Sequence, residues 1–387
     1  MISSHFRLGP HSLLELSRPR AAYVYYRTTR DNLLNGFPET YPFENFLRRL
    51  DQEVLQDPVE GHHVYHFHYE MGLLLQGLGH SVKDDVPLAI ELVYDGARKM
   101  RPLKPRISQL PLRSLERPQW SEYKEAFSFI QEELRAGNCY QVNVTYPFDF
   151  FTEDVVDPRD ILSFFFSRPG LGAFAHATQI HDELILSNSP ECLFQYRDNE
   201  LFTMPIKGTM KRKGSLREDW AQLKKSQKDE AELLMITDLL RNDLNRLDQP
   251  RARVVRKRAP LEVPGLLHQC SLLSVRLEKK ISLLHTLTSL FPGGSVTGAP
   301  KKRVMQIIQD VERSKRGIYC GSTLLCYGDR KMASINIRTA QVELSEKLWR
   351  YGAGGGITLG SNPVHEFQEM EAKVNSFLTL LQAPGYV

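Results

Sequence analysis

The stretch from residue 204 to residue 243, MPIKGTMKRKGSLREDWAQLKKSQKDEAELLMITDLLRND, holds the features around which the rest of the chain can be arranged. An apolar strand ends at Pro205, and a tight turn follows at residues 207–209, where glycine permits backbone angles that a Cβ disfavours. A basic loop then leads into a helix, because Ser226 followed three residues later by Asp229 is a capping-box pattern. The stretch therefore predicts a lysine on a turn, a threonine beside it and a helix directly after them.

Two helices each present a pair of acidic side chains. Asp229 and Glu232 are three residues apart, so both carboxylates lie on one face of their helix. Glu366 and Glu369 repeat this spacing near the end of the chain, with Lys373 on the same face. If the two faces oppose each other, they form an all-oxygen site suited to Mg²⁺, which binds one or two carboxylates, water and a substrate anion. Such acid pairs are also common on solvated helices, so the prediction depends on the faces meeting.

Composition and cysteine use indicate an ordinary globular protein in a reducing compartment. The chain has 387 residues, 41% of them hydrophobic and 25% charged, with a net charge of +4. Its five cysteines form no CxxC pair and no disulfide framework. The N-terminus, MISSHFRLGP, has no signal-peptide pattern, and no apolar run is long enough to cross a membrane. We therefore expect a cytoplasmic protein without a membrane span.

Three other patterns leave alternatives open. A histidine cluster at residues 62–68 lacks carboxylate or cysteine ligands at a suitable spacing, which favours structural or surface roles. The basic segment 251–258 is typical of a charged edge strand, and a nucleic-acid-binding patch is the alternative. Glycine-rich loops at 291–301 and 352–356 do not match ATP or dinucleotide fingerprints. Consecutive glycines still let backbone N–H groups approach an anion closely.

Taken together, a series of stretches resembles one family, the chorismate-utilising enzymes. The resemblance covers about residues 120–380, and the matching stretches occur in the family's order. They are GNCYQVN (137–143), SPE (189–191), PIKGT (205–209), KDEAE (228–232), DLLRND (238–243), His268 with Ser271, FPGGSVTGAP (291–300), RGIYCG (316–321), IRT (337–339), GAGGG (352–356) and the acidic helix 366–373.

The resemblance implies an α+β fold with large, mostly antiparallel sheets flanked by helices and a deep active-site cleft. Residues 120–383 would form the chorismate-binding catalytic domain. Residues 1–115 would form a shortened N-terminal segment packed on the same body. The composition of the proline-rich, basic stretch 101–118 independently predicts a linker or a covering segment.

Two positions favour the branch of the family that aminates chorismate at C4. Lys207 stands where members that form anthranilate carry alanine, and Gln141 stands where water-using members carry a lysine base. The resemblance therefore implies ammonia as the nucleophile and 4-amino-4-deoxychorismate, a precursor of p-aminobenzoate and folate, as the product. Anthranilate synthase component I is the alternative. From another class of protein, a nucleic-acid-binding module would use the segment 251–258.

The same resemblance implies roles for individual residues. Lys207 would form a covalent adduct at C2, Glu191 would protonate the departing C4 hydroxyl, and Thr209 and His268 would position that part of the ring. Mg²⁺ would be held by Glu232 and Glu369, with Asp229 and Glu366 acting behind them or through water. Substrate contacts would come from Gln141, Lys228, Tyr319, Arg338, Gly354, Gly355, Gly356 and Lys373.

The source of ammonia is a further expectation. None of the five cysteines lies in the glycine context of a nucleophile elbow with a downstream histidine and glutamate. We therefore expect ammonia to come from a separate glutamine amidotransferase subunit.

Overall fold

Antiparallel pairing joins the strands of this chain into one continuous run. The computed structural model describes residues 1–102, 104–263 and 266–381. Every strand pairing within these residues is antiparallel, which confirms the predicted sheet type. In order of pairing, the run is β14 (Arg253–Val263), β15 (Leu266–Arg276), β12 (Glu200–Met204), β11 (Cys192–Arg197), β18 (Arg330–Ile335), β17 (Ser322–Tyr327), β5 (His62–Phe67), β6 (Ala89–Met100), β2 (Ser12–Tyr25), β1 (Ile2–Gly9), β9 (His176–Ile180), β10 (Glu183–Ser187), β19 (Thr339–Glu343), β20 (Leu348–Ile357) and β8 (Gln141–Phe151).

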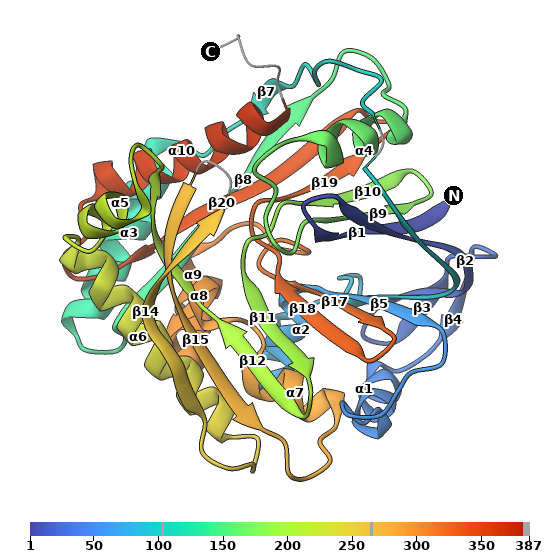
Figure 1. The fold of residues 1–387 in the computed structure, drawn as a ribbon, viewed down its shortest axis with the longest axis horizontal. Coiled ribbons are helices and arrows are strands. Elements are labelled where there is room, and N and C mark those ends of the chain that lie inside the picture. Colours follow the sequence, from blue (N-terminus) through green and yellow to red (C-terminus); the bar gives the residue numbers. More distant parts are fainter. Residues whose placement is uncertain (103, 264–265, 382–387) are drawn as a thin grey trace.

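Shorter strands extend this run at several points. They are β13 (Ile206–Lys211) on β15, β3 (Thr29–Asn32) on β2, β4 (Phe37–Thr40) on β3, and β7 (Arg113–Glu116) and β16 (Gly298–Ala299) on β8. The run passes around the molecule, so that its two ends, β13–β15 and β20–β8, lie on the same side (Figure 1). The N-terminal strands β1, β2, β5 and β6 form its middle. The domain boundary near residue 115 stays a prediction.

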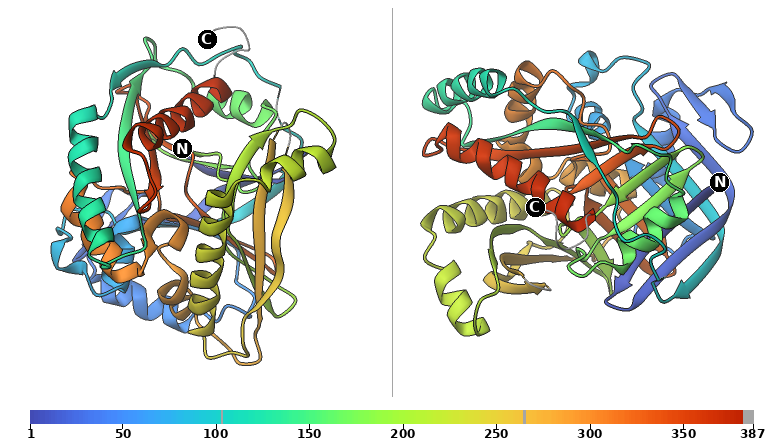
Figure 2. Two further views of the ribbon diagram at one scale, coloured as in Figure 1. Left: turned by 90° about the vertical axis from the view of Figure 1, so that its left-hand side faces the viewer. Right: turned by 90° about the horizontal axis from the view of Figure 1, so that it is seen from above.

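Helices pack on the outside of this run and at its ends. They are α1 (Phe43–Gln52), α2 (Tyr69–Leu75), α3 (Trp120–Arg135), α4 (Pro158–Ser167), α5 (Leu216–Leu223), α6 (Gln227–Asn245), α7 (Leu283–Leu290), α8 (Gly294–Thr297), α9 (Lys301–Val311) and α10 (Pro363–Leu381), with a 3₁₀ turn at Gly79–Ser81. Helix α6 contacts β13 and β15, whereas α10 contacts β20. Seen from above, α3, α6 and α10 lie on one side of the molecule and the N-terminal strands on the other (Figure 2). The α+β prediction is thereby confirmed.

Local sequence signals explain where the two acidic helices begin. The Ser226 hydroxyl accepts a hydrogen bond from the Asp229 N–H at 3.2 Å, so α6 starts where predicted. Asn362 accepts hydrogen bonds from two backbone N–H groups in the first turn of α10, directly before its Pro363. The reciprocal capping box is formed elsewhere, by Ser215 and Glu218 at the start of α5, a short helix for which no start had been identified from the sequence.

Two predicted loops are strands in the structure. Residues 207–209 belong to β13, where the pairing with β15 is shifted by a bulge at Gly208. Residues 352–356 lie in β20 and pair with β8. Both errors have one cause: glycine marks a special backbone position or a close approach within a strand as readily as it marks a loop.

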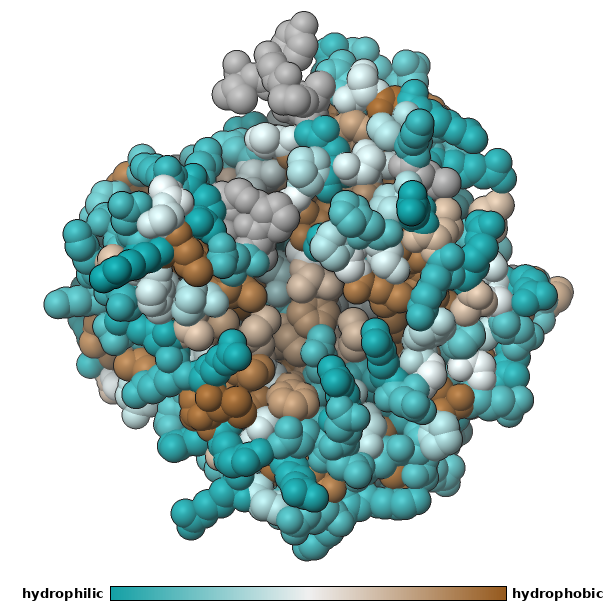
Figure 3. Space-filling model, viewed as in Figure 1, coloured by the Kyte–Doolittle hydropathy of each residue, from teal (hydrophilic) through white to brown (hydrophobic). Residues whose placement is uncertain are grey.

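Large buried hydrophobic clusters fill the space between the strands and helices. One lies between β5, β17, β11 and helices α1 and α7, and includes Phe46, Tyr65 and Leu287. Another joins β8 and β20 to α3, α4 and α10, and includes Phe165 and Trp349. On the face drawn in Figure 3, polar residues are interspersed with small apolar groups. None of the described helices combines the length and apolar composition needed to cross a membrane.

Candidate active site

A cavity of about 550 Å³ lies where the two ends of the strand run meet. Strands β13 and β15 and helix α6 line one side, and β20 and α10 line the other. Fourteen of the sixteen predicted site residues line it, that is, all except Gln141 and Gly355. They are Glu191, Lys207, Thr209, Lys228, Asp229, Glu232, His268, Tyr319, Arg338, Gly354, Gly356, Glu366, Glu369 and Lys373.

The bulge in β13 determines how Lys207 enters the cavity. Gly208 has a φ of 72°, a left-handed conformation that favours glycine. A Cβ at this position would lie 2.7 Å from the Gln269 side-chain nitrogen and 3.1 Å from the Asp229 Cβ. Glycine is therefore required both for its backbone angle and for space. The Lys207 Nζ lies 3.4 Å from a Glu232 carboxylate oxygen, and both side chains are less than a fifth exposed.

Thr209 and His268 form a hydrogen-bonded pair on the same wall. The Thr209 hydroxyl lies 2.7 Å from His268 Nδ1, and the two residues are opposite each other in the β13–β15 pairing. Burial, together with the positive charge of Arg338, lowers the pKa of His268 to about 4. The imidazole is therefore neutral at physiological pH and can both accept and donate a hydrogen bond.

Glu191 is the buried acid of the cavity. Glu191 is only 4% exposed. This burial raises the pKa of its carboxyl to about 7, although a hydrogen bond with Ser295 and the charge of Lys207 act to lower it. The segment is held in place because Ser189 donates a hydrogen bond to the Ile335 carbonyl and accepts one from the Glu191 N–H. A carboxyl with this pKa is substantially protonated near neutral pH and can donate a proton.

Lysines lie between the carboxylates of the two acidic helices. Lys228 on α6 binds Glu366 on α10 at 2.7 Å and is 3.9 Å from Glu232. Burial opposes the charge on Lys228, but the carboxylates outweigh it and raise its pKa. Lys373 binds Glu369 at 3.1 Å and the Gly354 carbonyl at 2.7 Å. The ion pair between α6 and α10 shows that the two acidic faces meet.

The donor set fits a hard cation such as Mg²⁺. Asp229, Glu232, Glu366 and Glu369 present only oxygen ligands to one cavity. No cluster of three histidine, cysteine or acidic side chains among residues 1–102, 104–263 and 266–381 has the arrangement of a complete metal site. Mg²⁺ does not require one, because it binds proteins through one or two carboxylates and completes its shell with water and substrate oxygens.

The opposite wall is suited to a carboxylate of the ligand. The pairing of β20 with β19 ends at Tyr351, so from Gly352 onward this edge of β20 is available to the cavity. Tyr319 packs directly against Gly352, where a Cβ would overlap its ring. Arg338 lines the same region and has a left-handed φ of 52°. An arginine with exposed backbone N–H groups is an effective site for a carboxylate.

Gln141 and Gly355 lie outside the cavity lining. Gln141 is fully buried against Gly356, and neither end of its amide has a hydrogen-bond partner among the described residues. In contrast, Asn143, Ser295 and other residues with no predicted role line the cavity. Asn143 and Ser295 belong to stretches that carried the family resemblance. The motifs do not show in which direction each side chain points, because that depends on how the strands and helices are oriented in the fold.

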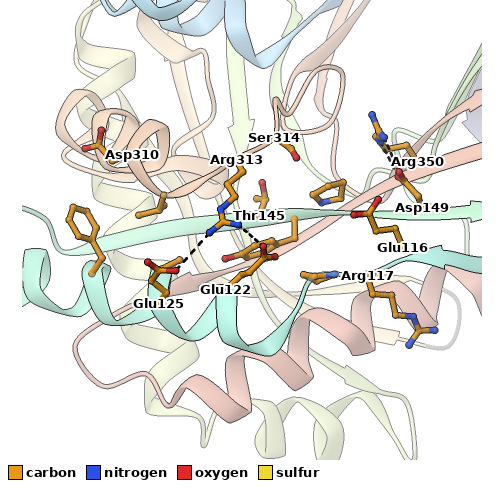
Figure 4. Close-up of a pocket in the computed structure, with 16 residues that line it drawn as sticks. Glu116, Arg117, Glu122, Glu125, Thr145, Asp149, Asp310, Arg313, Ser314 and Arg350 are labelled. Atoms are coloured by element: carbon orange, nitrogen blue, oxygen red, sulfur yellow. Dashed lines mark hydrogen bonds and ion pairs between the residues drawn. The ribbon is translucent and has the colours of Figure 1, made fainter.

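A second cavity, of about 450 Å³, lies between α3 and the segment after α9 (Figure 4). Arg313 extends from that segment to Glu122 and Glu125 on α3, and Arg350 pairs with Asp149 at 2.8 Å. None of the sixteen predicted site residues lines this cavity. We therefore assign the candidate active site to the larger cavity.

The fold agrees with comparisons to known proteins. The sequence profile of the family described as chorismate binding enzyme matches residues 47–379. The chain therefore belongs to the chorismate binding enzyme family.

The chain is similar to several individual proteins of this family. Aminodeoxychorismate synthase component 1 of Salmonella typhimurium is 38% identical over 267 residues, which are 67% of this chain and 58% of the relative. Anthranilate synthase component 1 of Saccharolobus solfataricus is 33% identical over 274 residues, 67% of this chain and 62% of the relative. The matched region thus spans little more than half of these relatives. The crystal structure of anthranilate synthase component I from Streptococcus pneumoniae shares the fold, with a TM-score of 0.75 at 20% identity over 95% of this chain and 92% of that one.

Proposed function

We propose that this protein aminates chorismate at C4 with ammonia to give 4-amino-4-deoxychorismate for p-aminobenzoate and folate biosynthesis. The observation that carries the proposal is that Lys207 and Glu191, a nucleophile and a proton donor, line one cavity with four carboxylates. Similarity to a relative named aminodeoxychorismate synthase component 1 supports the same reaction.

Substrate binding is assigned to the two opposite walls. Glu232 and Glu369 would hold Mg²⁺, supported by Asp229 and Glu366; when bound, the ion would neutralise the ring carboxylate of chorismate. Tyr319, Arg338 and the backbone of Gly354–Gly356 would bind the enolpyruvyl carboxylate. This division would put the ring between the metal-binding carboxylates and the groups that bind the enolpyruvyl carboxylate.

The reaction itself requires two displacements. Lys207 reacts in its unprotonated form: its nitrogen forms a bond to C2 while the two conjugated ring double bonds shift and the C4 hydroxyl leaves as water, taking the proton of Glu191. Ammonia then forms a bond to C4, both double bonds return to their original positions, and the bond between C2 and the lysine nitrogen breaks. The departing lysine regains its electron pair, and the excess proton of the new amine returns to Glu191. The enolpyruvyl group is retained, and the net change is exchange of hydroxyl for amine.

A partner and a compartment belong to the same proposal. We propose a separate glutamine amidotransferase as the source of ammonia, supported by the relatives' description as component 1. Turnover of glutamine by this purified chain alone would contradict it. The five cysteines are unpaired and buried, which supports a reducing, cytoplasmic setting.

Identification of the product tests the proposal directly. The purified chain is incubated with chorismate, Mg²⁺ and an ammonium salt, and the product is identified by mass. A product that retains the enolpyruvyl group and carries an amine at C4 is expected. Formation of fluorescent anthranilate, which lacks that group, would instead support the second candidate, anthranilate synthase component I, to which the Saccharolobus solfataricus relative points.

A further inference from the structure

The basic strand β14 contains one arginine that does not behave as a surface charge. Arg253 and Arg256 are exposed, but the Arg258 side chain is only 16% exposed. The pairing between β14 and β15 is irregular between Arg256 and Ala259, and Arg258 has a left-handed φ of 50°. This conformation is uncommon and costly for an arginine, and it persists where surrounding contacts stabilise it. The bulge therefore turns Arg258 from the surface toward the body of the protein.

The guanidinium of Arg258 contacts three separate elements. Its Nε donates to the Gln269 side-chain oxygen on β15 at 3.0 Å, and one Nη donates at 2.8 Å to the carbonyl of Lys224, at the end of α5. The other Nη forms an ion pair of 2.6 Å with Glu230 on α6. A planar guanidinium with donors in fixed directions suits such a three-way contact, whereas a lysine ammonium offers one charged centre.

These contacts lead to the bulge that presents Lys207. Gln269 is fully buried and lies opposite Lys207 in the β13–β15 pairing. Its amide nitrogen lies so close to Gly208 that an added Cβ would be 2.7 Å away. Glu230 directly follows Asp229, whose side chain would lie 3.1 Å from the same added Cβ. Arg258 thus connects the support of the Lys207 bulge to α6, the helix that carries two of the cavity's four carboxylates.

We infer that Arg258 is a positioning residue that holds the Lys207 bulge of β13 in register with helix α6. The inference rests on the proposed function, because positioning matters only if Lys207 reacts. It adds a residue that lies outside the cavity and touches no substrate atom. Displacement of a reacting group by about 1 Å can lower a rate about 100-fold, so a loosened support is expected to act on the catalytic step.

The test compares Arg258→Ala with Arg256→Ala, an exposed arginine two residues earlier on the same strand. Hydrogen–deuterium exchange is followed by mass spectrometry in the peptide that covers residues 205–211. Exchange should be faster in Arg258→Ala and unchanged in Arg256→Ala. With chorismate and saturating ammonia, Arg258→Ala should lower kcat about 10-fold with KM changed by less than about 2-fold, because truncation acts on alignment rather than on substrate binding.

The two readouts separate failure of this inference from failure of the proposed function. If the wild-type chain makes no C4-aminated product, the proposed function fails, while exchange still decides whether Arg258 holds the bulge. Unchanged exchange in Arg258→Ala, or a kcat equal to that of Arg256→Ala, would overturn the inference. If Arg258→Ala does not fold, Arg258→Lys replaces it. Lysine keeps the charge but cannot reach all three partners, so faster exchange is again expected, and wild-type exchange would overturn the inference.

Discussion

At the scale of single residues, the two reactive side chains, Lys207 and Glu191, have different electrostatic surroundings. Lys207 lies beside the Glu232 carboxylate, whereas Glu191 lies in a pocket whose burial raises its pKa to about 7. The lysine is thus placed where its charge is compensated, and the glutamic acid is placed where its proton is retained. A nucleophile and a proton donor that line one cavity allow the two displacements proposed above.

Replacement of Lys207 by alanine should mainly affect the chemical step. We expect kcat to fall at least about 100-fold, equivalent to about 2.7 kcal/mol in the barrier, with little change in KM if KM approximates Kd. The carboxylate-binding groups lie elsewhere in the cavity, so chorismate binding should persist. Lys211→Ala, at the exposed end of the same strand, is the matched control. Wild-type turnover by Lys207→Ala at saturating ammonia would remove Lys207 from the mechanism.

The raised pKa of Glu191 predicts a pH dependence. The carboxyl must be protonated to act, so kcat should fall as the pH rises through about 7. The measurement needs a constant concentration of free ammonia, because the unprotonated fraction of ammonium also rises with pH. Glu191→Gln should reduce kcat about 100-fold or more and abolish this limb of the profile. Persistence of the limb in Glu191→Gln would assign it to another group.

At the scale of elements, the glycines of β20 allow the strand to lie against β8 and the cavity at once. A Cβ at Gly354 would overlap the Val144 carbonyl and lie 2.8 Å from the Thr145 Cα. At Gly355 the nearest atom outside the strand is a Glu366 oxygen at 3.7 Å, an ordinary contact distance. Neighbouring glycines in the same strand therefore meet different steric limits.

This difference can be measured as stability. Gly354→Ala should lower the free energy of unfolding by about 2 kcal/mol, because overpacking forces the backbone of β8 and β20 apart. Gly355→Ala should change it by about 0.5 kcal/mol or less. Chemical denaturation of both variants and the wild type provides the comparison. Equal stability of the two variants would show that β20 can move away from β8 without cost.

At the scale of the whole molecule, buried polar contacts join the N-terminal strands to the rest of the run. His66 on β5 contacts the Thr323 hydroxyl on β17 at 2.9 Å and the Thr178 hydroxyl on β9 at 3.0 Å. Ser4 on β1 contacts the same Thr178 hydroxyl. Burial also lowers the pKa of His68, which precedes α2, to about 4. His66 and His68 are therefore interior, so that of the two roles expected for the histidine cluster, structural or surface, these two residues have the structural one.

The buried histidines predict a loss of stability in acid. His68 titrates near 4 in the folded protein and near 6.5 in the unfolded chain, so the unfolded state binds more protons as the pH falls below 6.5. Between pH 6.5 and 5 this residue alone should cost about 1.5 kcal/mol. His68→Gln should lessen the wild-type loss by that amount, whereas His80→Gln, on the surface, should not. Parallel pH dependence of His68→Gln and wild type would contradict the assignment.

Buried carboxyl groups add stability as the pH falls, so their contribution must be separated from the loss caused by the histidines. Burial raises the pKa of Glu70 and of Glu53, so protonation of these groups offsets part of the histidine loss as the pH falls. The comparison between variants cancels this contribution, because the acids are common to all of them.

Local signals in the sequence determined the acidic helices, their starting points and the family. Ser226, Asn362 and Pro363 act within one turn, and the i, i+3 spacing of the acids places each pair on one face whatever the fold. Fourteen of the sixteen site residues that the motifs implied line the cavity. These features could be predicted because each depends on neighbours that are close in sequence.

Only the tertiary structure decided how these parts meet. Lys228 and Glu366 are far apart in sequence but form an ion pair, and the glycines at 208 and 354 are needed because other strands and side chains approach them. Arg258 belonged to a run of surface charges by composition, yet a bulge turns it to Gln269 and Glu230. Strand pairing between distant segments determines such contacts. The hydrophobic periodicity of one segment does not indicate which distant segment will pair with it.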